Sequence, residues 1–405
     1  MPNPSPSPEE ARGSSREVFL VFLRLGCTSF GGPVAHLGYF QKEIVERQRW
    51  CSEGRLAELI ALAQSLPGPA SSQVGFALGI LRAGWLGGLA AWIGFTLPSA
   101  LLMMAFAYGH SFLVGSAAIR LLHGLQLVAV AVVAQAVLAM RRTLAPDRMR
   151  MTLAIVATGI ALFASPRFST LIAIGAGVAG GLLFCRSYDE HEYSESIVLP
   201  WPKAAGAAAA IIFLVLLVLP PLIAPHVSTP GLAIFSAFYR SGALVFGGGH
   251  VVLPLLENAV VTPGWVTQQT FLAGYGAAQA LPGPLFSFGA YLGASVGPAH
   301  RPILYGLLGL IGIFMPGLVA MAAVLPFWSA LRGNFYIRAA LTGINASIVG
   351  VLIAALFQPL WTNTVHTSGD FLIVLLAFTL LIFWKVQPWI VVACVAATSV
   401  LANFR

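Results

Sequence analysis

The sequence contains few charged residues for its length. Of its 405 residues, 22 are Lys or Arg and 14 are Asp or Glu, which makes 9% charged, whereas a soluble globular protein has about 25%. The apolar share is 58% and the mean hydropathy is +0.85. A soluble fold cannot hide that much apolar surface, so this composition excludes a cytosolic enzyme, a disordered chain and a nucleic-acid-binding protein. Lipid must surround most of the molecule.

The sequence also lacks the motifs of metal and enzyme sites. Its four cysteines form no CxxC pair, and no Walker loop, Ser/His/Asp set or metal-ligand spacing is present. We therefore expect no metal, no cofactor and no enzymatic activity. Residues 1–16 are rich in Pro and Ser without an apolar core, so they predict a disordered tail rather than a signal peptide.

Long apolar blocks account for most of the chain. A membrane-crossing helix needs about 20 apolar residues. Two blocks, 151–185 and 371–404, are each interrupted once and predict two short helices apiece. Five blocks are uninterrupted and predict full crossings: 85–109, 116–140, 204–224, 303–328 and 337–358. The pattern predicts an all-α polytopic integral membrane protein.

Four other apolar blocks contain Gly and Pro near their middle. Proline removes a helical hydrogen bond and glycine frees the backbone, so each block predicts two half-helices that re-enter the membrane as a hairpin. The blocks and their breaks are 17–40 at Phe30-Gly31-Gly32-Pro33, 56–81 at Leu66-Pro67-Gly68-Pro69, 236–258 at Phe246-Gly247-Gly248-Gly249, and 270–293 at Leu281-Pro282-Gly283-Pro284.

The breaks recur in the same order, which indicates an internal duplication. FLRLGCTSFGG (22–32) matches FYRSGALVFGG (238–248), and ALAQSLPGP (61–69) matches GAAQALPGP (276–284). Arg24 thus corresponds to Arg240, and Gln64 to Gln279. We predict a first membrane repeat over 17–185, a linker over 186–235 that includes the crossing 204–224, and a second repeat over 236–405.

The distribution of positive charge predicts that the repeats are inverted. From a cytoplasmic N-terminus, hairpins that return to their own side place the loops 41–55 and 141–150 in the cytoplasm. Each of these loops holds four Lys or Arg, whereas the matched stretches 249–270 and 359–370 hold none. Cytoplasmic loops are enriched in Lys and Arg, so the second repeat is expected to lie the other way up.

The paired signatures FGGP with LAQSLPGP and FGGG with AAQALPGP resemble the chromate ion transporter (CHR) family, in particular its long two-domain bacterial members. The lead-in from Trp50 to Ala57, echoed from Trp265 to Ala273, adds to the resemblance, which spans residues 17–402. The second glycine run departs from the first, since Gly249-His250 follows where Pro33 stands. The resemblance implies chromate export across the bacterial inner membrane, with sulfate as the structural analogue, and hence chromate resistance.

A site for a tetrahedral dianion needs backbone N–H groups, hydroxyls and one or two cations. A half-helix that starts after Pro-Gly-Pro directs its free N–H groups and positive dipole end at the break. The alternative is that the breaks only permit tight packing of the hairpins. The candidate residues at the breaks are Gly31, Gly32, Pro67, Gly68, Pro69, Ser71, Ser72, Gly247, Gly248, Pro282, Gly283, Pro284 and Ser287.

Arg24 and Arg240 are single cations inside apolar blocks, where an arginine is costly and needs a partner. A guanidinium suits a tetrahedral oxyanion, although it can also extend to the interface or pair with a hairpin carbonyl. Extension to the interface is the favoured interpretation for Arg120 and Arg338. Gln64 and Gln279 could hold the hairpin crossing or contact the ion.

Export driven by the proton motive force would need a proton carrier. Glu43 and Glu257 are candidates on the return arms of the first hairpins, and His36, His250 and His123 titrate near neutral pH. Each of these groups is also compatible with an interfacial anchor or a helix cap.

The sequence therefore predicts a secondary transporter with an inorganic oxyanion as substrate and the lipid bilayer as surroundings, and it leaves a homodimer open. A sulfate or other oxyanion importer, or an anion channel, stays an alternative because the same donors bind both ions. An integral-membrane enzyme acting on a lipid phosphate would need clustered acids or an interfacial His/Asp pair, which the sequence lacks.

Overall fold

The computed structural model describes residues 13–110, 116–165, 168–185, 202–226, 230–297, 301–331 and 333–401. Within these ranges the chain is helical and contains no strand, so the predicted all-helical fold is confirmed. Helix α1 (Ser15–Thr28) begins inside the expected tail, because Ser14 and Glu17 form a capping box at its start. Residues 1–12 of that tail, and 186–201 of the expected linker, lie outside the described residues.

Helices long and apolar enough to cross a membrane cover all five uninterrupted blocks. The most exposed of them is α8, whose most apolar window is only 11% buried, so α8 lies at the edge of the molecule. The five helices are α4 (Ala70–His110), α5 (Ser116–Leu144), α8 (Lys203–Ile223), α13 (Pro302–Val324) and α15 (Phe335–Ala355).

The shorter helices end and begin at the expected interruptions. Helix α4 continues from the second break into the following span through a kink at Ala83 and Gly84. The shorter helices are α2 (Gly32–Phe40), α3 (Glu53–Ser65), α6 (Arg148–Phe163), α7 (Ser169–Phe184), α9 (Pro230–Ala243), α10 (Val252–Val260), α11 (Gln268–Ala278), α12 (Phe288–Val296), α16 (Ser368–Ile382) and α17 (Pro388–Leu401).

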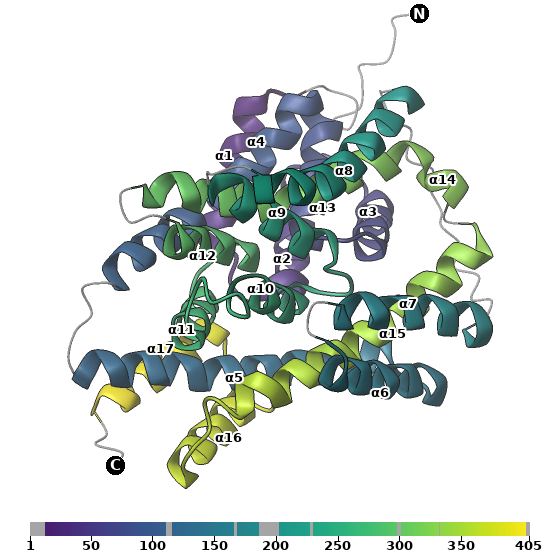
Figure 1. The fold of residues 1–405 in the computed structure, drawn as a ribbon. Coiled ribbons are helices and arrows are strands. Elements are labelled where there is room, and N and C mark those ends of the chain that lie inside the picture. The colour runs from purple at the N-terminus through teal and green to yellow at the C-terminus, as the bar shows by residue number, and fades with distance from the viewer. Residues whose placement is uncertain are drawn as a thin grey trace, which may run out of the picture.

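Each half of the chain packs one long helix against the last helices of the other half. Helix α15 lies against α6 and α7, and α5 lies against α16 and α17 (Figure 1). Glycines allow the close approach of α15 and α7: a Cβ on Gly343 would lie 2.0 Å from the carbonyl oxygen of Gly177. With the long helices packed across the halves in this way, the short helices α2, α10, α11 and α12 lie near the middle of the molecule.

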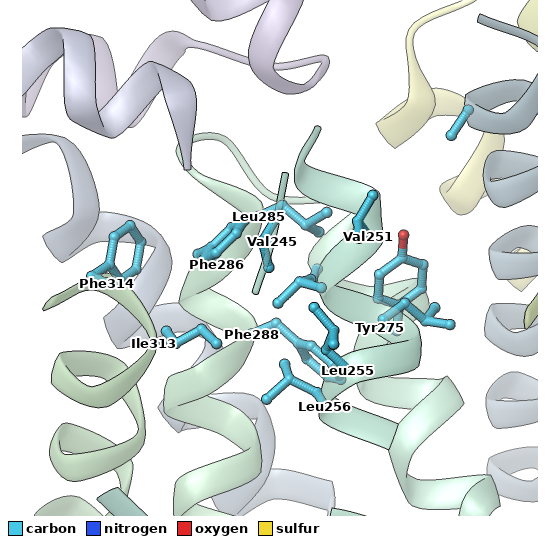
Figure 2. Packing of buried hydrophobic residues seen from close by; sticks show 14 of the residues in the cluster. Val245, Val251, Leu255, Leu256, Tyr275, Leu285, Phe286, Phe288, Ile313 and Phe314 are labelled. Atoms are coloured by element: carbon cyan, nitrogen blue, oxygen red, sulfur yellow. The ribbon is translucent and has the colours of Figure 1, made fainter. Parts of the chain in front are cut away.

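Apolar side chains fill the space around these central helices. Figure 2 shows Phe288 close to Leu255 and Leu256 of α10, and Phe286 and Ile313 belong to the same buried cluster. All of them are fully or nearly fully buried. The core therefore holds the broken segments in place by packing on all sides.

Candidate functional site

The two Phe-Gly-Gly breaks meet at the centre of the molecule. Pro33 on α2 and Gly249, at the start of the short turn η3 (Gly249–Val251), hold matched sequence positions. A Cβ built on Gly249 would lie 3.4 Å from Cγ of Pro33. Two segments at matched positions in the sequence therefore lie next to each other.

Each Pro-Gly-Pro break is hydrogen-bonded to the Phe-Gly-Gly break of the other half. The backbone N–H of Gly68 donates to the carbonyl of Val245, just before the second Phe-Gly-Gly, at 2.7 Å. The backbone N–H of Gly283 donates to the carbonyl of Ser29, just before the first Phe-Gly-Gly, at 2.9 Å. These four residues form two matched pairs, so each half completes the break of the other.

We call the two pairs, Gly68 with Val245 and Gly283 with Ser29, the glycine crossing. Both the backbone conformation and the available space require glycine there. Gly68 has φ +120°, and a Cβ on it would lie 2.6 Å from Cα of Gly317. Gly283 has φ +89°, and its Cβ would lie 2.9 Å from Oγ of Ser99. Positive φ also occurs at the other break glycines that the sequence predicts for the site, namely Gly31, Gly32, Gly247 and Gly248.

A glutamine that the sequence analysis did not single out holds the first crossing. The side chain of Gln73 on α4 is fully buried, and its Nε2 donates to the carbonyls of Pro67 at 2.9 Å and Gly317 at 3.0 Å. Gln64 has an exposed side chain. The crossing is therefore held by Gln73, and its signal in the sequence is an amide within the apolar run that follows Pro-Gly-Pro.

Two buried polar residues connect the first hairpin to the start of α4. Nδ1 of His36 lies 3.3 Å from Oγ of Ser71, and its ring packs edge-on against Phe95 at a centroid distance of 5.2 Å. The ring also lies beside the backbone of Ser29, whose carbonyl receives the Gly283 bond. His36 and Ser71 thus stand next to the crossing.

Several hydroxyls near this crossing are buried and have no hydrogen-bond partner among the described residues. They belong to Ser29, Ser72 and Thr96. A buried hydroxyl without a partner costs about 1–3 kcal/mol, so such groups point to a ligand or water. Ser287 is buried in the short turn η4 (Leu285–Ser287), one turn before α12. Hydroxyl donors are therefore concentrated on the first half.

The second half has a different polar chain. Nδ1 of His250 lies 2.8 Å from the hydroxyl of Tyr275, a fully buried residue of α11. The Gln279 side chain lies beside the same hydroxyl. His250, Tyr275 and Gln279 thus form a chain that leads toward Pro282. Tyr275 is a further residue that the sequence analysis did not find, because its match in the first half is Ile60.

The structure places the two matched arginines in different surroundings. Arg24 lies on the exposed face of α1. Arg240 is also accessible, but it lines a cavity of about 600 Å³ between α7, α8, α9 and α10. Neither arginine joins an ion pair within the described part of the chain, and neither belongs to the described contacts at the glycine crossing.

The two glutamates considered as proton carriers also differ in their surroundings. Glu43 lies in the π-helical turn η1 (Gln41–Arg47) and accepts hydrogen bonds from Arg47 at 3.1 Å and Gln48 at 2.9 Å. Glu257 on α10 is 8% exposed and forms no ion pair among the described residues. His123 bonds Asp370 at 2.8 Å, which ties α5 to the start of α16.

This arrangement defines a class of protein: a multi-pass helical membrane protein whose broken helices converge on buried polar groups. Such convergence is typical of transporters. The profile described as Chromate transporter matches residues 16–182 and, a second time, residues 232–400. The chain belongs to the chromate transporter family, as the resemblance predicted.

Curated relatives agree with this assignment. The chain is 33% identical over 344 residues to the chromate transport protein of Pseudomonas aeruginosa, covering 83% of this chain and 79% of that protein. It is 27% identical over 397 residues to the probable chromate transport protein of Synechococcus elongatus, covering 95% of both. The uncharacterized transporter YwrA of Bacillus subtilis is 28% identical over 172 residues, which cover 41% of this chain and 95% of YwrA. No solved structure matches the chain.

Proposed function

We propose that the protein is a secondary transporter that exports chromate across the inner membrane, driven by the proton motive force, and so confers chromate resistance. The observation that carries the proposal is the match of the chromate transporter profile to both halves of the chain. The chromate transport protein of Pseudomonas aeruginosa, matched over most of its length, supports the same substrate.

In the proposed architecture, two repeats of inverted topology, 17–185 and 236–405, face each other across the membrane midplane, and the N-terminus is cytoplasmic. The loop charges, the exchanged hydrogen bonds of Gly68 and Gly283, and the half-length relative YwrA support this arrangement. The four broken blocks act as re-entrant hairpins, and the repeats rock about the contact of Pro33 with Gly249.

The oxyanion site of the proposal lies between the hairpin tips. Backbone N–H groups at the breaks and the hydroxyls of Ser71, Ser72 and Ser287 donate to the anion, and Arg24 and Arg240 supply positive charge along its path. Gln64 and Gln279 are further ligand candidates. His36, His250, Glu43 and Glu257 are the candidates for carrying protons in the opposite direction.

An oxyanion importer or an anion channel would use the same donors, and the direction of transport separates these from export. Everted membrane vesicles should take up labelled chromate when a proton gradient is imposed, and vesicles without the protein should not. Equal uptake in both, with and without the gradient, would remove the proposal. Uptake of sulfate but not chromate, or uptake that ignores the gradient, would favour the importer or the channel.

A further inference from the structure

The cavity around Arg240 is built mainly on the second half, and its lining includes Leu244, next in the chain to Val245 of the glycine crossing. Its walls come from the start of α7, the end of α8, α9, α10 and the turn 261–265. Pro225 and Pro263, at the ends of two of these elements, line it together with Arg240. The cavity therefore extends from the ends of helices into the depth of α9.

If α9 enters the membrane at Pro230, as in the proposed topology, helix geometry gives the depth at which Arg240 lies. Helix α9 begins at Pro230, close in sequence to the end of α8, and Arg240 follows ten residues later. At 1.5 Å per residue this places Arg240 about 15 Å along the helix, which is half the thickness of a hydrocarbon core of about 30 Å. A cation at mid-depth is costly unless water or an anion reaches it.

The lining favours an anion. None of the cavity's described lining residues is acidic, and Arg240 is its one cation within the same set. The cavity is also lined by Thr170, Ser236, Ser241, Asn258 and Thr262, which carry hydroxyl or amide groups. A guanidinium with such donors matches the oxygens of a tetrahedral oxyanion.

The first half offers no equivalent cavity wall. Arg24 corresponds to Arg240 but lies on an exposed helix face, and no helix of the described first half corresponds to α8. The end of α8 closes one wall of the cavity through Pro221 and Pro225, and this wall has no counterpart beside Arg24 among the described residues.

We infer that the Arg240 cavity is the outer vestibule of the oxyanion path, a binding station that an inorganic tetrahedral dianion occupies between the central site and the external medium. The inference rests on the proposed function for the substrate and on the proposed topology for the side, which places the end of α8 and the turn 261–265 outside. The vestibule accordingly opens to the outer face of the membrane.

The test measures charge selectivity in the cavity and does not require transport. Cys27, Cys185 and Cys394 are changed to Ser, the buried Cys51 is kept, and Asn258→Cys is introduced beside Arg240. In intact spheroplasts, the modification rates by an anionic and a cationic methanethiosulfonate of similar size are compared, and the signal of the background chain is subtracted. Thr262→Cys, in the turn 261–265, serves as a second reporter if the first variant does not fold.

We expect the anionic reagent to be favoured, and Arg240→Gln to lower the anionic-to-cationic rate ratio about fivefold, whereas Arg240→Lys keeps it. External sulfate or chromate should slow the modification. A ratio that does not respond to Arg240→Gln, or modification only from the cytoplasmic face of everted vesicles, would overturn the vestibule.

A lipid phosphate offers the same chemistry and is distinguished by a second arm. In proteoliposomes, protection by phosphatidylglycerol but not by sulfate would assign the cavity to lipid and also overturn the inference. A charge-selective cavity in a protein that moves no chromate would leave the vestibule standing and remove the proposed function, so the two failures are separable.

Discussion

Pro33 and Gly249 occupy matched positions in the two halves of the chain and lie against each other, with 3.4 Å between Cγ of Pro33 and a Cβ built on Gly249. The contact joins segments at matched positions of the two halves. The difference between proline and glycine has a steric meaning here, because one partner is bulky and the other has no side chain. A rocking motion about this point must preserve that fit.

A size series at Gly249 tests the importance of this contact for transport. Gly249→Ala should transport normally, since its Cβ would find only ordinary contacts of 3.4 to 3.9 Å with Pro33, Leu285 and Phe286. Gly249→Val should lower the transport rate about tenfold, because its added methyl groups overpack the contact at a cost of about 1–3 kcal/mol. Vesicle uptake is compared at equal amounts of folded protein. Normal transport by the valine variant would contradict this role of the contact.

Gly68→Ala should destabilise the fold strongly. The residue has φ +120°, and the new Cβ would lie 2.6 Å from Cα of Gly317, so strain and overlap together cost about 3 kcal/mol. Gly159→Ala is the matched control, because that helical glycine has nothing within 4 Å of its Cβ position. Thermal unfolding in detergent should show a lower midpoint for Gly68→Ala alone. Equal midpoints for both variants would show that the crossing is not tight.

The helix breaks were predictable because their cause is local. Proline and glycine act on the backbone where they stand, so Pro67, Gly68 and their matches mark the ends of helices within their own segments of sequence. The partners of each break were not predictable, because Val245 and Ser29 are brought to Gly68 and Gly283 only by packing between the halves. No local pattern encodes that exchange.

The arginines show a second limit of what can be predicted from the sequence. Arg24 and Arg240 stand at matched positions in matched motifs, so the sequence predicted the same role for both. The structure places Arg240 in a cavity with one wall from α8, and α8 has no counterpart beside α1 among the described residues. Duplicated motifs thus predict matched backbone positions, whereas the surroundings of a side chain depend on elements outside the motif.

Gln73→Leu should destabilise the protein because it removes the amide donor that the carbonyls of Pro67 and Gly317 share. Each lost hydrogen bond costs about 0.5–1.5 kcal/mol. Gln64→Leu is the matched control, since that glutamine is exposed on α3. The unfolding midpoint in detergent should fall for Gln73→Leu and stay at the wild-type value for Gln64→Leu. A similar midpoint for both would mean that Gln73 does not hold the crossing.

Glu43 and Glu257, on the return arms of the first hairpin of each half, should differ in their contribution to proton coupling. Glu43 is bound by Arg47 and Gln48 near the surface, whereas Glu257 is buried without an ion pair among the described residues. A cation already pairs with Glu43, so Glu257 is the better candidate for the coupling role. Glu257→Gln should abolish the response of chromate uptake to an imposed proton gradient, and Glu43→Gln should retain it. The reverse result would move the coupling role to the first half.

The inverted topology predicts opposite sides for matched loops. Glu46 in η1 and Gln269 at the start of α11 are both exposed, and a cysteine can replace each in the chain that keeps only Cys51. A membrane-impermeant thiol reagent should modify Glu46→Cys in everted vesicles and Gln269→Cys in intact spheroplasts. Arg142→Cys, in the last turn of α5, should behave like Glu46→Cys, because both positions belong to stretches, 141–150 and 41–55, that carry the cytoplasmic charge excess. Modification of the Glu46 and Gln269 variants from the same side would require parallel repeats, and the two halves would then be related by an axis along the membrane normal.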